Sequence, residues 1–297
     1  MVLYDPPIGV MSFNVGGLPS GLAPAKVRAV EFCRLIEQSG VDVVNLQEVW
    51  TYRLLDFIRA QLPSFGSVAW RAGLAGQPAG GLASFSRLRL AAPRFVSFRG
   101  IRARTGTPLF RVAKAVNSTL QGALIFEIAG RRTLVGNTHL SANRDGDWST
   151  GNRHHTFQRA QVVALHDALR RARDADCEMT ILAGDLNICS DSALYPLVVG
   201  NGAWRDPFAR TNQPTFHADL LPPNRIPRRI DYLLVTADAE RYPTTEPDML
   251  FTEPTRLANG RRTYLSDHLA LTIRLQLPPM PPPPDRNRKR GTGHGRS

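Results

Sequence analysis

Short apolar runs that end in polar residues recur along the 297 residues of this chain. The clearest run, 179–183, is too short for a helix and predicts a buried strand. It ends in the polar stretch Gly184-Asp185-Leu186-Asn187. The other segments that predict strands are 9–15, 41–47, 80–86, 121–128, 132–137, 229–235 and 266–275.

Longer segments between these strands have helical character. Pro24 suits the first turn of a helix, and Gly40 follows the same segment where a helix would end. The last such segment has apolar residues at Val162, Leu165 and Leu169, which is helical spacing. The predicted helices are 24–39, 50–62 and 156–174.

Many strands interrupted by a few helices predict an α/β fold of two packed sheets covered by helices. No convincing boundary divides residues 1–277, so we expect a single domain there. Residues 278–297 are rich in proline and basic side chains. That composition cannot pack a core and predicts an extended, disordered tail.

The net charge of the chain is +12, from 37 lysines and arginines against 25 acidic residues. Lysine occurs only at Lys26, Lys114 and Lys289, so the charge is carried by arginine. A basic, arginine-rich chain favours anionic partners such as nucleic acid or an acidic membrane surface. An arginine-rich composition shared by a whole proteome would give the same numbers.

Features of export are missing from the sequence. No apolar run approaches the roughly eighteen residues of a membrane span. The first residues lack the basic start and apolar stretch of a signal peptide. The three cysteines are widely spaced and form no CxxC pair, which argues against disulfides and zinc. We expect a cytoplasmic protein, free or peripherally attached to a membrane; its oligomeric state stays open.

The stretch that ends the central strand carries candidate chemistry. Side chains at positions i and i+2 of an extended chain share a face, so Asp185 and Asn187 can point into one site. A carboxylate can deprotonate a water, and an amide can hold an oxyanion. The alternative is an ordinary turn after a core strand, where Asp and Asn are common.

Polar residues of the same kind occur at the ends of several other predicted strands. Any one of them has an ordinary explanation, such as a solvated carboxylate or a structural histidine. Their repetition along the chain is hard to attribute to chance. The residues are Asn14, Glu48, His139, Asp231, Asp267 and His268.

These residues occur in an ordered series of motifs. The series resembles that of the endonuclease/exonuclease/phosphatase superfamily over residues 9–276. The resemblance implies a four-layer α/β/β/α sandwich and cleavage of phosphoester bonds with Mg²⁺ or Mn²⁺. The motifs are Asn14, Leu46-Gln47-Glu48, Asn137-Thr138-His139, Gly184-Asp185-Leu186-Asn187, Arg229-Ile230-Asp231-Tyr232 and Ser266-Asp267-His268.

Three of these residues are predicted to hold the metal. Glu48 offers a hard oxygen ligand, which suits Mg²⁺ better than a soft metal. Asn14 and Asp267 would complete the coordination or support it.

The resemblance also implies catalytic roles for the remaining residues. Asp185 is the base that positions the water, and Asn187 holds the water or the phosphate. His268 contacts the phosphate or acts as an acid, with its ring oriented by Asp231. His139 is a second cationic donor to the phosphate.

Sequence details favour one branch of the superfamily. With a histidine at position 139, the chain resembles the deoxyribonuclease I, sphingomyelinase and inositol phosphatase branches at this strand end. The stretches 14–19, 46–50 and 80–87 are similar to neutral sphingomyelinases. A sphingomyelinase-like phospholipase C is therefore the first hypothesis. A deoxyribonuclease I-like nuclease is the second, supported by the basic charge, and other phosphate esters stay open. The hypothesis of another class is an inactive member that serves as a binding module.

One position departs from the sphingomyelinase pattern. Where those enzymes tend to have Lys-Gly, this chain has Gln121-Gly122. Lys114 could substitute from a neighbouring loop, or it could be a solvated loop lysine. Among the tryptophans, we expect Trp50 to pack within its helix, and Trp148 is the better candidate for substrate contact. His154 is expected to be solvated.

Overall fold

The architecture is that of a computed structural model, which describes residues 6–17, 22–74, 76–236, 242–244 and 247–279. The predicted basic tail lies outside these residues from position 280 onward, so it stays a prediction. The same holds for Leu18 and Pro19 of the sphingomyelinase-like stretch. In the described part of the chain, no helix combines the length and apolar character needed to cross a bilayer.

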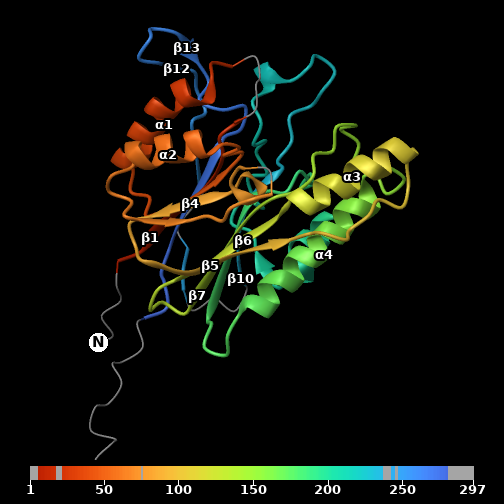
Figure 1. Ribbon diagram of the computed structural model, residues 1–297, viewed down its shortest axis with the longest axis horizontal. Coiled ribbons are helices and arrows are strands. Elements are labelled where there is room, and N and C mark those ends of the chain that lie inside the picture. Colours follow the sequence, from red (N-terminus) through yellow and green to blue (C-terminus); the bar gives the residue numbers. More distant parts are fainter. Residues whose placement is uncertain (1–5, 18–21, 75, 237–241, 245–246, 280–297) are drawn as a thin grey trace, which may run out of the picture.

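Two mixed sheets form the centre of the molecule (Figure 1). The first sheet has the strand order β11-β14-β1-β2-β4-β3 among the described residues. Its strands are β1 Ile8–Asn14, β2 Val43–Gln47, β3 Ser67–Ala69, β4 Ala83–Ser86, β11 Asp248–Leu250 and β14 Ala270–Leu275.

The second sheet has the order β5-β6-β7-β8-β10-β9. A small separate pair, β12 Thr255–Arg256 and β13 Arg262–Thr263, lies apart from both sheets. The strands of the second sheet are β5 Leu90–Ser97, β6 Gly122–Ile128, β7 Thr133–His139, β8 Met179–Asp185, β9 Trp204–Arg205 and β10 Asp231–Thr236.

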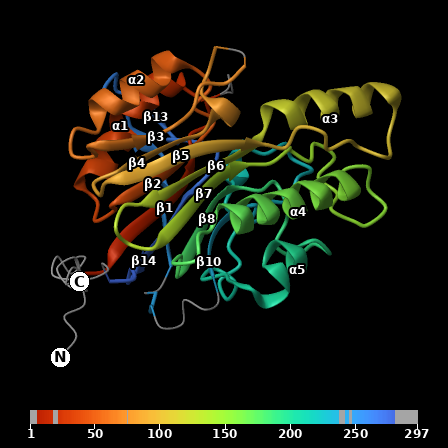
Figure 2. The same cartoon turned by 60° about the horizontal axis from the view of Figure 1, so that its bottom comes forward.

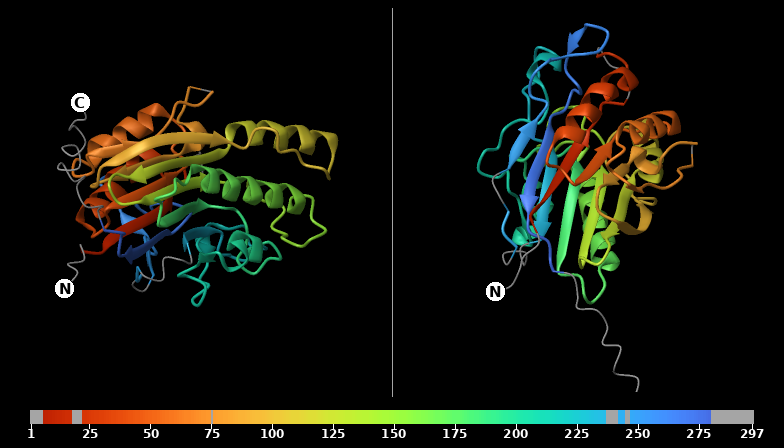
Figure 3. Two further views of the ribbon diagram at one scale, coloured as in Figure 1. Left: turned by 90° about the horizontal axis from the view of Figure 1, so that it is seen from below. Right: turned by 90° about the vertical axis from the view of Figure 1, so that its left-hand side faces the viewer.

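Helices cover the outer faces of the two sheets (Figures 2 and 3). Helices α1 Ala25–Gln38 and α2 Tyr52–Gln61 lie on the first sheet, and the others lie on the side of the second. Those others are α3 Pro108–Leu120, α4 His155–Ala172 and α5 Tyr195–Val198. Short 3-10 turns occur at η1 Ala79–Gly81, η2 Gly200–Gly202 and η3 Ala218–Leu220.

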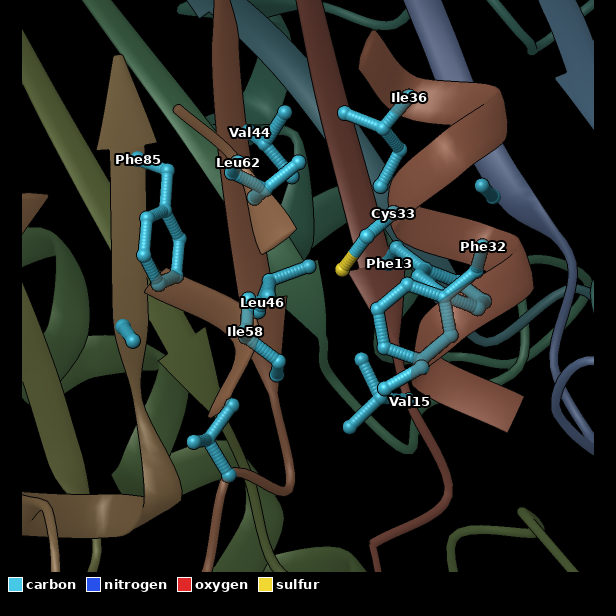
Figure 4. Close-up of a cluster of buried hydrophobic side chains, with 14 of the residues drawn as sticks. Phe13, Val15, Phe32, Cys33, Ile36, Val44, Leu46, Ile58, Leu62 and Phe85 are labelled. Atoms are coloured by element: carbon cyan, nitrogen blue, oxygen red, sulfur yellow. The ribbon is translucent and has the colours of Figure 1, made fainter. Parts of the chain in front are cut away.

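Three clusters of buried apolar side chains fill the interfaces between these layers. One packs α1 and α2 on the first sheet, with Phe32 and Ile58 of the helices against Phe13 and Phe85 (Figure 4). A second lies between the sheets, and a third packs α4 on the second sheet. The predicted four-layer α/β/β/α sandwich is therefore confirmed.

The strand directions bring many strand ends to one edge. β1 is parallel to β2, and β7 is parallel to β8, so His139 lies beside Asp185. β10 runs antiparallel to β8, and its first residue, Asp231, pairs with Asp185. β14 likewise runs antiparallel to β1. Antiparallel strands begin where their neighbours end, so starts and ends meet at this edge.

Several predicted boundaries were wrong. The final strand begins at Ala270, so Asp267 and His268 lie in the segment before it. Helix α2 begins after its N-cap Thr51, which leaves Trp50 outside the helix. Strand β5 and helix α3 were not predicted at all. β5 is half-buried and carries Pro93, and α3 buries only polar residues. Strand β5 lacks a clear apolar alternation, whereas α3 has apolar residues at helical spacing that face solvent and do not mark a core face.

The interface between the sheets becomes polar close to this edge. The Asn137 amide of β7 donates to the carbonyls of Leu46 and Ala83 in the first sheet, at 3.0 and 3.3 Å. Gln47 donates back to Asn137 Oδ1 at 2.8 Å. Buried polar groups are stable when they are paired in this way. The network therefore joins the two sheets beneath the strand ends.

We predict that Phe32→Ala lowers the free energy of unfolding by about 3–5 kcal/mol, because it leaves a cavity in the first cluster. The matched control is Val30→Ala on the same helix, where the side chain is 38% exposed. This control should change stability by less than about 0.5 kcal/mol. Denaturant unfolding of the two variants measures the difference, and similar losses in both would contradict the layer assignment.

Candidate active site

Asp185 lies at the centre of the converging strand ends. Its side chain is buried, with Oδ1 accepting from the Asn187 N–H at 2.9 Å and Oδ2 from Asn14 Nδ2 at 3.0 Å. The preceding Gly184 has a φ of 152°, and a Cβ there would lie 2.1 Å from the carbonyl oxygen of Thr138. Glycine is therefore required for β8 to place Asp185 this close to β7.

His268 forms a buried pair with Asp231. Its Nδ1 lies 2.9 Å from Asp231 Oδ2, which also accepts from the Thr215 hydroxyl at 2.6 Å. The ring meets Phe216 edge to face at 4.9 Å between centroids. Its other nitrogen, Nε2, lies 3.7 Å from Asp185 Oδ2. These contacts fix the ring with Nε2 directed at the central carboxylate.

His139 faces the same carboxylate from β7. Its Nε2 lies 3.4 Å from Asp185 Oδ2. Its Nδ1 is buried and has no hydrogen-bond partner among the described residues. The ring of Trp50 lies 6.1 Å from that of His139. Trp50 thus borders the site, and the expectation that it packs within a helix was wrong.

The local charges shift the two central groups toward acid–base function. Burial and the charge of Asp231 raise the pKa of Asp185 to about 6, against the opposing effect of the two histidines. Burial alone would lower the pKa of His268, but Asp231 and Asp185 together raise it well above 6.5. Near neutral pH, a carboxylate able to take a proton therefore faces a protonated imidazole.

Two half-buried carboxylates, Glu48 and Asp267, lie beside this centre. The Asn14 amide donates to Glu48 Oε1 at 3.3 Å. A Cβ on Gly16, whose φ is +57°, would lie 2.7 Å from Asp267 Oδ1, so glycine leaves room for that carboxylate. Carboxylate and amide oxygens are the hard donors that Mg²⁺ and Mn²⁺ prefer. The donor set thus fits a divalent metal.

A second group of possible metal ligands is Asp185, Asp231 and His268, whose ligand atoms lie within 4.8 Å of one another. His268 Nδ1 and Asp231 Oδ2 already share a hydrogen bond, and all three side chains are buried. Glu48 and Asp267 are more accessible and purely oxygen donors. We therefore favour the Glu48 side for a hard metal and the second group for proton transfer.

Residues that sequence reasoning missed support this arrangement. Arg28 of α1 is fully buried and donates to the carbonyls of Ala23, Val15, Gly16 and Leu265. Burial lowers its pKa, and the nearby charges of Asp267 and Glu48 oppose that shift. Arg28 therefore ties the segment that follows β1 to the segment that carries Asp267. No local pattern distinguishes such an arginine from a surface one.

The sequence model of the Endonuclease/Exonuclease/phosphatase family matches residues 11–268, which include every strand end described above. The chain belongs to this family. No curated protein sequence matches it at a significant level.

Solved structures share the family fold. Sphingomyelinase C from Streptomyces griseocarneus aligns with a TM-score of 0.64 at 20% identity, over 91% of this chain and 99% of its own. TDP2 of D. rerio, complexed with a single-strand DNA product, gives 0.65 at 17%, over 92% and 100%. An endonuclease/exonuclease/phosphatase protein from Beutenbergia cavernae gives 0.65 at 18%, over 93% and 73%. At these identities the likeness establishes the fold.

In this family member a cleft of about 660 Å³ opens beside Asn187. Asn187 has a φ of 52° and donates from its amide to the Leu140 carbonyl at 3.0 Å. Its own carbonyl accepts from Trp148 Nε1 at 3.0 Å. The cleft combines arginines with apolar side chains. They include Arg144, Arg225, Arg228, Trp148, Phe216, Leu221, Ile226 and Ile230.

Lys114 lies behind the wall of this cleft. It is a buried residue of α3, and its Nζ donates to Ser141 Oγ at 2.7 Å and to the Ala142 carbonyl at 3.1 Å. Both predicted alternatives placed it in a loop, and that placement and the predicted solvation were wrong. Gln121 accepts from Gln161 Nε2 at 3.0 Å. Through its hydrogen bonds to Ser141 and Ala142, Lys114 supports the segment that follows His139.

His154, at the other end of the loop that follows His139, was also predicted wrongly. It is buried rather than solvated, and its ring meets Phe110 edge to face at 4.9 Å between centroids. Burial and the charge of Lys114 lower its pKa to about 4. The ring is therefore neutral at physiological pH and packs the loop against α3.

The state of Lys114 makes stability depend on pH. Burial, with Arg144 and Arg153 nearby, lowers its pKa to about 8 from 10.5. Below pH 8 the buried ammonium of Lys114 destabilises the folded state. Between pH 8 and 10.5 the folded state releases that proton before the unfolded state does, so the destabilisation is relieved. Over this range the free energy of unfolding of wild type should therefore rise by about 2 kcal/mol relative to that of Lys114→Met. This value is below the full effect of the pKa shift because solvent screens part of it.

Denaturant unfolding of wild type and Lys114→Met at pH 7, 8.5 and 10 measures that gain. The difference between the two proteins cancels the titration of groups that do not interact with Lys114. Parallel stability curves for the two proteins would show that Lys114 is not buried as a charged group.

Proposed function

We propose that this family member is a Mg²⁺-dependent phosphodiester hydrolase with sphingomyelinase-like phospholipase C activity. The observation that carries the proposal is the position of Asp185, between two histidines and beside Asn14. A base, an acid and hard oxygen donors therefore converge within one site. Phosphodiester hydrolysis needs these three functions together.

Each side chain then has a role that its contacts support. Asp185 accepts the proton of the attacking water, since its pKa of about 6 suits a base near neutral pH. Asn187, held by its bond to Leu140, positions that water or a phosphate oxygen. A metal held by Glu48, Asp267 and Asn14 would neutralise negative charge on the phosphate.

The two histidines act on the phosphate as proton donors. His268 carries a proton on a ring that Asp231 and Thr215 hold in place, so it can donate to a phosphate or leaving-group oxygen. His139 offers a second donor 3.4 Å from Asp185. The histidine nitrogens and the Asp185 carboxylate are therefore separate groups, so the acid and the base can act on different atoms of the same substrate.

The cleft supports an amphiphilic substrate. Trp148, Phe216 and Ile226 give it apolar surface beside Asn187, whereas Arg144 and Arg225 supply positive charge. Apolar walls with a few placed polar groups are typical of sites for small molecules and lipid head groups. A phospholipid presents a phosphodiester next to apolar chains and matches both features.

A nuclease is the second candidate, because the same arginines and the +12 net charge also suit a polyanion. The third candidate, an inactive binding module, is supported less well. Such a protein has no use for the buried Asp185, His268 and Asp231 cluster, whose desolvation is costly.

We predict that Asp185→Asn and His268→Ala each lower kcat at least a hundredfold, because each removes about 3 kcal/mol of transition-state stabilisation. Both variants should still unfold cooperatively. Asp56→Asn, an exposed carboxylate of α2, is the control and should keep wild-type activity. Retained activity in either site variant would remove that residue from the mechanism.

The substrate is tested by incubating the protein with Mg²⁺ on sphingomyelin vesicles and, side by side, on supercoiled plasmid DNA. Phosphocholine release that EDTA and His268→Ala both abolish is the expected result. Plasmid nicking without phosphocholine release would replace the lipid assignment with the nuclease. Inactivity on both substrates, with Mg²⁺ and Mn²⁺, would reject the lipid and nuclease assignments and leave another phosphate ester or the binding module.

A further inference from the structure

Helix α3 has its polar and apolar faces reversed. Its buried residues are Lys114 and Ser118. Its apolar residues Leu109, Val112 and Val116 face solvent, with exposed fractions of 79%, 62% and 54%. Surface helices of globular proteins normally turn their apolar face to the core. The three exposed residues, called here the α3 stripe, therefore have no partner among the described residues.

The spacing of the α3 stripe makes it one continuous surface. Residues three and four positions apart are neighbours on a helix, and 109, 112 and 116 follow that spacing. A helix with a solvated apolar face is stabilised when another apolar phase covers that face. The stripe is thus a candidate docking surface, and the question is which apolar partner covers it.

The charge around the stripe identifies the occupant. Residues 57–126 contain no aspartate or glutamate, and their basic side chains include Arg102 and Arg104, shortly before α3 in the sequence, and Arg111 on the helix itself. These three arginines are exposed, and none forms an ion pair with another described residue. An apolar stripe flanked by arginine fits an anionic lipid surface, where valines enter the acyl boundary and arginines meet phosphates.

The position of α3 relative to the site agrees with this occupant. The helix extends beyond the sheets on the side where the strand ends converge (Figures 1 and 2). Lys114, on its buried side, holds Ser141 and Ala142, and Ala142 lines the cleft. Ile226, on another wall of that cleft, is 70% exposed. Helix α3 therefore carries the stripe on its outer face and supports a wall of the cleft on its inner face.

We propose that the α3 stripe and its flanking arginines dock the protein on anionic phospholipid membranes. The inference deepens the proposed function, on which it rests for its purpose, because docking brings a phospholipid hydrolase to its substrate. A second copy of the chain fits less well, since stacking two such faces would bring arginines against arginines. Nucleic acid would satisfy the arginines but leave the valines in water.

The test is flotation of the purified protein with vesicles of phosphatidylcholine alone or of phosphatidylcholine and phosphatidylserine. EDTA is present and sphingomyelin absent, so that binding is measured without hydrolysis. The docking variant is Val112→Ser with Val116→Ser. The matched control is Val30→Ser with Val163→Ser, which makes the same replacements at 38% and 42% exposed positions on α1 and α4.

We expect wild type and the control variant to bind the anionic vesicles, and the docking variant to bind at least about tenfold more weakly. Hydrolysis of detergent-dispersed sphingomyelin should be equal in all three proteins. If no protein hydrolyses sphingomyelin but the binding contrast holds, the proposed function fails and the docking surface stands. Equal vesicle binding by both variants would overturn the docking surface. The docking surface would also be overturned if wild type were a dimer that does not bind vesicles and the docking variant were a monomer.

Discussion

The site depends on one hydrogen bond between the sheets, from the Asn14 amide of β1 to Asp185 of β8 at 3.0 Å. Both side chains are buried, so neither can turn to water for a substitute partner. A buried carboxylate costs several kcal/mol unless its oxygens are paired, and the Asn14 amide is the partner of Asp185 that comes from the other sheet. Because Asn14 also donates to Glu48, the same amide fixes Glu48 relative to Asp185.

The mixed strand directions make that contact available. Parallel pairs bring Asn14 beside Gln47 and His139 beside Asp185, whereas the antiparallel strand β10 begins with Asp231 at the same edge. The three apolar clusters between the four layers supply the stability that holds these polar ends together. The result is a site with unlike charges at close range. There the pKa of His268 is raised, and that of Asp185 is brought to about 6.

Much of this arrangement could be predicted from the sequence, because apolar runs ending in polar residues mark core strands and their functional ends. Asp185, His139 and Glu48 follow that rule directly. Asp267 and His268 precede a strand and could be grouped with them only through the motif series. Arg28 and Thr215 act through tertiary contacts that no local pattern encodes. Lys114 was misplaced because its helix was not predicted, and that helix buries its polar side and exposes its apolar one, contrary to the usual orientation of a surface helix.

The central claim is that side chains from the two sheets act as one catalytic unit, which a double-mutant cycle tests most directly. The measurement is kcat/KM on the accepted phosphodiester for wild type, Asn14→Ala, Asp185→Ala and the double variant. Since residues that act as a unit are strongly non-additive, the double variant should lose about as much as Asp185→Ala alone. Losses that multiply would mean that Asn14 and Asp185 act independently, and the account of a single site joined across the sheets would be wrong.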